Sequence, residues 1–156
     1  MTLKELRKAK GITQKQAADF VGVPLRTYHI YENDLKKYDT IKYKYILEKL
    51  YVYGYTDETN GILTLNQIKE ICTSVLSKYS VNYCYLFGSY AKGKATPISD
   101  IDLFINTEEK GLNFFGLVED LRTNLKKKVD LLDQNQIKEN FALMNEILKD
   151  GIKIYG

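Results

Sequence analysis

The fold and the chemistry of this chain are decided by the stretch LFGSYAKGKATPISDIDLFI, residues 86–105. The pair Gly88-Ser89 closes an apolar run of β-branched and aromatic residues, which is typical of a buried strand. Two aspartates, Asp100 and Asp102, then stand one residue apart in a second apolar run. Residues i and i+2 of a strand point to the same face, so the two carboxylates are expected to lie side by side while the apolar residues between them face the core.

Carboxylates placed side by side repel one another unless a cation lies between them. Asp130, in the short apolar stretch VDLL, would join Asp100 and Asp102 if the two strands are neighbours. Asp130 taken alone could instead be a surface residue, and Asp133 competes for its role. A cluster of carboxylates without His or Cys is an oxygen-only site, which suits Mg²⁺ or Mn²⁺. The alternative interpretation of the two aspartates is a solvated edge strand.

The Gly-Ser pair indicates a phosphate-binding turn. Gly88 permits close backbone approach, and the Ser89 hydroxyl can bind a phosphate oxygen together with free N–H groups at the start of a short helix over 89–92. Lys92 and Lys94 add positive charge nearby. A nucleoside triphosphate with bridging metal ions would be activated there for in-line attack at phosphorus.

The chain is predicted to contain two domains, 1–57 and 58–156, joined near the polar stretch YGYTDETNGIL. In the first, capping boxes at Thr2 and Thr13 and a turn at Gly22 predict three short helices in a helix-turn-helix arrangement. A fourth helix is expected over 40–53, with one side formed by Ile41, Tyr45, Ile46, Leu50 and Tyr53. The second is predicted to be an α/β domain with a small mixed sheet. Its expected strands span 81–87, 100–105, 129–132 and 152–155, with helices following Thr64 and over 114–125 and 137–148.

Composition excludes several classes of protein. Of 156 residues, 44% are hydrophobic and 28% charged, as in globular proteins, and no apolar run approaches the length of a membrane span. The two cysteines lie in apolar segments, so we expect a reduced, cytoplasmic protein. Residues 1–57 carry 11 basic and 7 acidic residues, a net +4, whereas residues 58–156 carry 12 and 13, a net −1. The basic first part is a weak indication of nucleic-acid contact.

The spacing Gly88-Ser89, ten residues, then Asp100-Ile101-Asp102 resembles the signature of the DNA polymerase β-like nucleotidyltransferases, in particular the minimal nucleotidyltransferase branch. The resemblance covers residues 64–156. It implies that Asp100, Asp102 and Asp130 are catalytic and bind the metal ions, with Asp130 helping to deprotonate the attacking hydroxyl. It also implies that Gly88, Ser89 and Lys92 bind the triphosphate of ATP, although the family usually has Arg at the position of Lys92.

The segment LKELRKAKGITQKQAADFVGVPLRTYHIYEN is similar to the phage-repressor (XRE) type of helix-turn-helix. The resemblance implies DNA contacts by Gln14, Arg26, Thr27 and His29, and places Leu25 and Ile30 at apolar base-reading positions. Of the base-reading positions only Arg26 is a good base reader. The alternative is a module that serves protein contact or dimerisation.

The combination of the two domains resembles antitoxins in which a minimal nucleotidyltransferase acts on a HEPN-type toxin ribonuclease. The resemblance implies transfer of AMP from ATP to a tyrosine of that toxin, which neutralises it, while the helix-turn-helix binds operator DNA and autoregulates the operon. Two other functions stay open: a nucleotidyltransferase that acts on tRNA or a small molecule, and a non-catalytic DNA-binding antitoxin or repressor.

Overall fold

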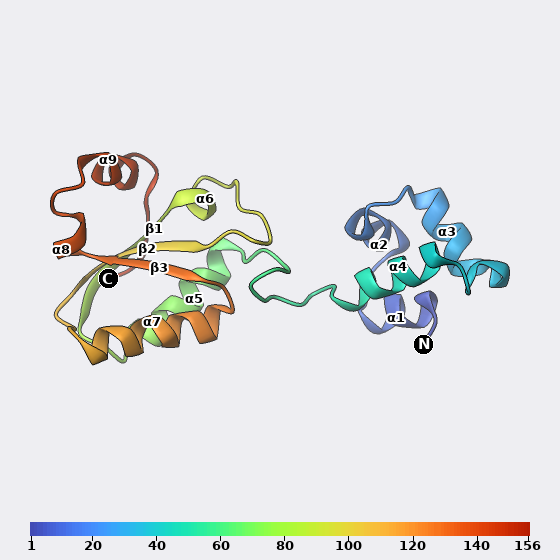
Figure 1. Cartoon of the computed structure of the whole chain (residues 1–156), viewed down its shortest axis with the longest axis horizontal. Helices are drawn as coiled ribbons and strands as arrows, with labels where there is room; N and C mark the ends of the chain where they lie inside the picture. Colours follow the sequence, from blue (N-terminus) through green and yellow to red (C-terminus); the bar gives the residue numbers. More distant parts are fainter. The chain divides into compact units, whose positions relative to one another are not determined.

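The computed structural model describes residues 1–156, which fold as two compact units, Met1–Tyr55 and Thr56–Gly156. The first unit consists of helices, and the second of a four-stranded sheet with helices on both faces (Figure 1). The predicted fold class, a helical domain followed by an α/β domain with a small mixed sheet, is confirmed. The domain boundary at 57/58 stays a prediction. None of the helices combines the length and the apolar character needed to cross a membrane.

The first unit contains the predicted helix-turn-helix. Its elements are α1 (Leu3–Ala9), α2 (Gln14–Val21), α3 (Leu25–Asn33), the 3₁₀ turn η1 (Leu35–Lys37) and α4 (Ile41–Tyr51). Thr2 and Thr13 form the capping boxes expected from the sequence. Gly22 ends α2 in the left-handed conformation, with φ 78°, and so allows the tight turn into α3.

The side of α4 that packs into the core matches the prediction at Ile46 and Leu50 and differs from it at Ile41 and Tyr45. Tyr43, Ile46 and Leu50 are buried, whereas Ile41 is 88% exposed and Tyr45 is 47% exposed. The Tyr43 hydroxyl accepts a hydrogen bond from the backbone N–H of Leu3, and its ring stacks on Tyr38. These contacts of Tyr43 direct it into the core together with Ile46 and Leu50, and leave Ile41 and Tyr45 at the surface.

The second unit alternates helix and strand. Its elements are α5 (Leu65–Leu76), β1 (Val81–Phe87), α6 (Gly88–Ala91), β2 (Ile101–Thr107), α7 (Leu112–Leu125), β3 (Val129–Asp133), α8 (Gln134–Ile137), α9 (Phe141–Asp150) and β4 (Ile152–Tyr155). The strand order is β3-β2-β1-β4. Only β2 and β3 run parallel; β1 pairs antiparallel with both of its neighbours. All four predicted strands are present.

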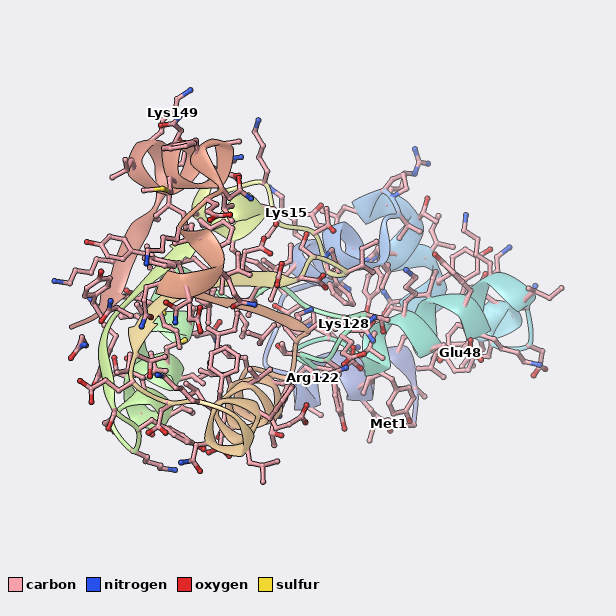
Figure 2. The ribbon with its side chains drawn as sticks, turned by 60° about the vertical axis from the view of Figure 1, so that its left-hand side comes forward. Met1, Lys15, Glu48, Arg122, Lys128 and Lys149 are labelled. Carbon is pink, nitrogen blue, oxygen red and sulfur yellow. The ribbon has the colours of Figure 1, made fainter.

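Helices α5 and α7 lie on one face of the sheet and enclose the main core, and α8 and α9 lie on the other face (Figure 1). Arg122 on α7 and Lys149 on α9 mark these two sides in Figure 2. The second face holds a smaller apolar cluster centred on Phe87, Ile137 and Ile147.

The helix predicted over 137–148 is α9 in the structure and begins later, at Phe141, whereas Ile137 ends the separate short helix α8. Asp133 caps α8 by accepting from the backbone N–H groups of Asn135 and Gln136. Asn140 caps α9 by accepting from the N–H of Leu143. Each cap starts a separate helix, so helical structure is interrupted between Ile137 and Phe141. The apolar spacing in the sequence continues across this interruption.

Lys127 fastens two loops of the second unit. Its side chain is fully buried, and its ammonium donates to the carbonyl oxygens of Asn60 (3.1 Å), Gly61 (2.7 Å) and Pro97 (2.6 Å). Burial lowers the pKa of Lys127. Because Pro97 lies three residues before Asp100, this contact also fixes the end of the loop that carries Asp100.

Candidate active site

The aspartate pair stands at the beginning of β2. The strand alternates: Ile101, Leu103 and Ile105 are fully buried against the main core, while Asp102 is partly exposed on the opposite face. Asp100 is exposed and lies one residue before the strand begins, rather than within it as predicted. The sheet therefore holds Asp102 rigidly, and Asp100 belongs to the preceding loop.

Asp130 is the register partner of Asp102 across the parallel strands β2 and β3. Register partners on neighbouring strands point to the same face, so the two carboxylates are adjacent. Asp133, the competing candidate, is the capping residue of α8 and accepts two backbone hydrogen bonds there. Of these two alternatives, the structure brings Asp130 next to Asp102.

The Gly-Ser turn packs directly on Asp102. Phe87, the last residue of β1, is the register partner of Asp102 on the other side of β2. The next residue, Gly88, has φ +70°, and a Cβ atom built there would lie 2.1 Å from Oδ2 of Asp102. Only glycine leaves room for this carboxylate. Ser89 is partly buried in the first turn of α6, and no hydrogen bond within the protein engages its hydroxyl.

The carboxylates of this site perturb one another. Burial raises the pKa of Asp102 to about 6, and the charges of Asp130, Asp100 and Glu146 act in the same direction, while Lys92 opposes them. Three carboxylates and one ammonium act on Asp102, so the negative charge of the site is incompletely balanced by the protein.

The donor set fits a hard divalent cation. The charged oxygens that act on Asp102 belong to Asp130, Asp100 and Glu146, and a cation would relieve their mutual repulsion. No three of the chain's His, Cys, Asp and Glu side chains are gathered tightly enough to hold a metal ion as the structure stands. The three-carboxylate metal site therefore stays a prediction.

Lys92, predicted to bind the triphosphate, is already paired. Its ammonium lies 2.9 Å from Oε1 of Glu146, a residue of α9. Sequence reasoning did not single out Glu146, because it stands 44 residues after Asp102 in an amphipathic helix with no motif around it. What identifies Glu146 is its position in the structure, on the helix that lies over this face of the sheet.

The predicted DNA contacts all lie in α2 and α3. Arg26 and His29 are exposed, and Thr27 is partly exposed. Gln14 stands in the first turn of α2, where its amide donates to Glu32 (3.2 Å) and its oxygen lies 3.4 Å from Nδ1 of His29. These contacts tie α2 to α3, and the DNA-binding role of the four residues stays a prediction.

A mixed sheet carrying adjacent aspartates beside a Gly-Ser turn defines the class of nucleotidyltransferases. Residues 66–156 match the family described as Polymerase beta, Nucleotidyltransferase, and residues 3–39 match the family described as Helix-turn-helix. The chain therefore belongs to the polymerase β-type nucleotidyltransferase family, with a helix-turn-helix at its N-terminal side.

Curated relatives match the chain over about half of its length and over most of theirs. A Methanocaldococcus jannaschii protein, provisionally named a protein adenylyltransferase, is 39% identical over 87 residues, which are 51% of this chain and 87% of the relative. The protein adenylyltransferase MntA of Thermococcus cleftensis is 33% identical over 88 residues, which are 53% and 89%. A crystal structure described as a toxin-antitoxin with AMP-PNP aligns with a TM-score of 0.47 and 27% identity, covering 59% of this chain and 74% of the other.

The contact between Gly88 and Asp102 can be tested by adding a single methyl group at residue 88. We expect Gly88→Ala to lower nucleotidyl transfer about 100-fold, because the new methyl group displaces the Asp102 carboxylate from its place at the site. The positive φ also strains alanine by about 1–2 kcal/mol. The measurement is a transfer rate alongside a thermal unfolding curve.

Gly93→Ala is the matched control for this strain. Gly93 has φ +69°, but no atom lies within 4 Å of the place that a Cβ would take, so it suffers the same backbone penalty without touching Asp102. The expected result is similar destabilisation with largely retained transfer. Equal loss of transfer in both variants would mean that backbone strain, and not the displaced carboxylate, causes the effect.

Proposed function

We propose that this chain is a metal-dependent protein adenylyltransferase that transfers AMP from ATP to a tyrosine of a HEPN-type toxin ribonuclease and thereby neutralises it. The observation that carries the proposal is the packing of Gly88 against Asp102, with Asp130 at the adjacent register position. The turn that we propose to bind phosphate thus contacts Asp102, whose register partner is Asp130. The names of the relatives at 39% and 33% identity support a protein as the acceptor.

In the proposed reaction the tyrosine oxygen attacks the α-phosphorus of ATP. The bond from the α-phosphorus to the oxygen bridging it to the β-phosphorus breaks, diphosphate leaves, and the hydroxyl proton passes to Asp130. Gly88, Ser89 and Lys92 hold the triphosphate in line for this attack. Asp100, Asp102 and Asp130 would hold Mg²⁺ or Mn²⁺, which supplies charge neutralisation and polarisation of phosphoryl oxygens when bound.

The helical unit is proposed to bind operator DNA and autoregulate the operon. Arg26 and His29 are exposed on α3, the second helix of the helix-turn-helix, where base contacts are made in this arrangement. Gln14 and Thr27 would contact the backbone beside them. The basic charge of residues 1–57, a net +4 from 11 basic and 7 acidic residues, favours binding to phosphates.

The test is incubation of the purified chain with Mg²⁺, the product of a neighbouring HEPN-type gene, and ATP labelled at either the α- or the γ-phosphate. The proposal expects label on the partner protein from α-labelled ATP and none from γ-labelled ATP, with mass spectrometry locating AMP on a tyrosine. Parallel reactions contain tRNA. Label on tRNA would overturn the acceptor assignment, and no label anywhere together with a sequence-specific gel shift would favour a non-catalytic repressor.

A further inference from the structure

The ion pair between Lys92 and Glu146 joins α9 to the residue that directly follows α6. Lys92 directly follows α6, whose first turn contains Ser89, and Glu146 comes from the middle of α9. The pair is 2.9 Å long, and the two side chains are 37% and 33% exposed. Through this ion pair α9 is connected to the short helix that contains the Gly-Ser turn.

Glu146 lies in the electrostatic field of the whole site. Its hydrogen bond and charge raise the pKa of Lys92, with smaller contributions from Asp150 and Asp102. Its charge also raises the pKa of Asp102. The carboxylate of Glu146 thus contacts the cation expected to bind phosphate, and its charge also acts on a carboxylate expected to bind metal.

We propose that Glu146 is a positioning residue that competes with the triphosphate of ATP for Lys92 and so sets the affinity for the nucleotide. This inference rests on the proposed function. The Lys92 ammonium is paired with Glu146 when no nucleotide is bound, so the triphosphate must take over that partner. Once the triphosphate has done so, Glu146 is left as an unpaired negative charge beside it, which further weakens binding.

The magnitude of the competition follows from exposure. Partly exposed ion pairs contribute little to stability, so a multiply charged triphosphate displaces Glu146 readily. Removing the competing carboxylate should therefore tighten ATP binding by at most about fivefold.

Glu146 is not needed to hold α9 on the sheet. Ile147 is buried, and Leu143 and Met144 pack against Phe87 and Ile137 in the smaller apolar cluster. The opposite side of the helix faces solvent, as Lys149 does in Figure 2. We therefore expect Glu146→Gln to leave the fold of α9 intact.

The experiment is calorimetric titration of the full chain with ATP in the presence of Mg²⁺. We expect Glu146→Gln to lower the dissociation constant about three- to fivefold and Lys92→Met to raise it. In the double variant, Glu146→Gln should change the affinity of Lys92→Met by less than twofold, because Glu146 acts through Lys92. With the partner protein added, Glu146→Gln should lower KM for ATP and leave kcat unchanged.

Glu119→Gln is the matched control, because Glu119 is an exposed carboxylate on α7 on the other face of the sheet. It removes the same charge and should leave the affinity unchanged. Unchanged or weaker binding by Glu146→Gln would overturn the inference, as would an equal gain in the Lys92→Met background, which would indicate a general charge effect. Absence of ATP binding by the unaltered chain would instead overturn the proposed function itself.

Discussion

Replacing Asp102 with asparagine is expected to lower AMP transfer about 1,000-fold and, in the same protein, to make the second unit more stable. The loss follows because Asp102 is the carboxylate that packs on Gly88 and pairs with Asp130, so it would lie at the centre of the proposed site. The gain follows because its charge is partly desolvated and is repelled by three other carboxylates. Asparagine has nearly the same shape and no charge.

The stability difference should depend on pH in a defined direction. The pKa of Asp102 is raised from 3.8 to about 6 in the folded chain, so the folded state binds more protons than the unfolded state between these values. Stability therefore falls as pH rises from about 4 to about 6 and levels off above that. The full shift would correspond to about 3 kcal/mol, and partial exposure reduces the expected difference to about 1–2 kcal/mol.

Thermal unfolding in EDTA from pH 4 to pH 8 measures this difference directly. Asp102→Asn should unfold at a higher temperature than the unaltered chain at pH 8 and at a similar temperature at pH 4. Added Mg²⁺ should stabilise the unaltered chain and not the variant, because only the former would bind it. Asp39→Asn, at an exposed aspartate of the first unit, is the control and should change neither property. Retained transfer by Asp102→Asn would place the active site elsewhere.

The sequence predicted the parts of the site that are set by local periodicity. Strand alternation was sufficient to put Asp102 on the face opposite Ile101 and Leu103, and the Gly-Ser turn followed from where the apolar run ends. The choice between Asp130 and Asp133 needed the structure. Asp133 is three residues further along and caps α8, and a capping aspartate looks the same as a metal-binding one in sequence.

Features that depend on tertiary packing could not be predicted. Lys127 belongs to a run of three lysines after the predicted helix over 114–125, but its side chain is buried and donates to three carbonyl oxygens of two loops. Glu146 reaches Lys92 only because α9 folds back over the sheet. In both cases the partner is distant in the sequence and carries no motif, so the charge pattern alone indicated an ordinary surface.

The second large expected effect is on the stability of the helical unit, which contains a buried ion pair between Arg7 and Glu32. Glu32 is 2% exposed, and its carboxylate accepts from Nε and Nη2 of Arg7, both at 2.9 Å. Burial alone would raise the pKa of Glu32, but hydrogen bonds from Arg7 and Gln14 outweigh it and lower the pKa. The contribution of this carboxylate to stability is therefore present above its ordinary pKa and is lost as pH falls through the lowered value.

We expect Arg7→Met to destabilise the first unit by about 3–5 kcal/mol, because it leaves the Glu32 carboxylate buried without its main partner. The double variant Arg7→Met with Glu32→Leu should recover most of this loss, since no unpaired charge remains. Lys8→Met, at an exposed lysine of the same helix, should change stability by less than about 0.5 kcal/mol. Hydrogen exchange of peptides from residues 1–55 in increasing urea separates this unit from the other. Failure of the double variant to recover would mean that the pair organises α1 and α3 through its geometry, beyond satisfying a buried charge.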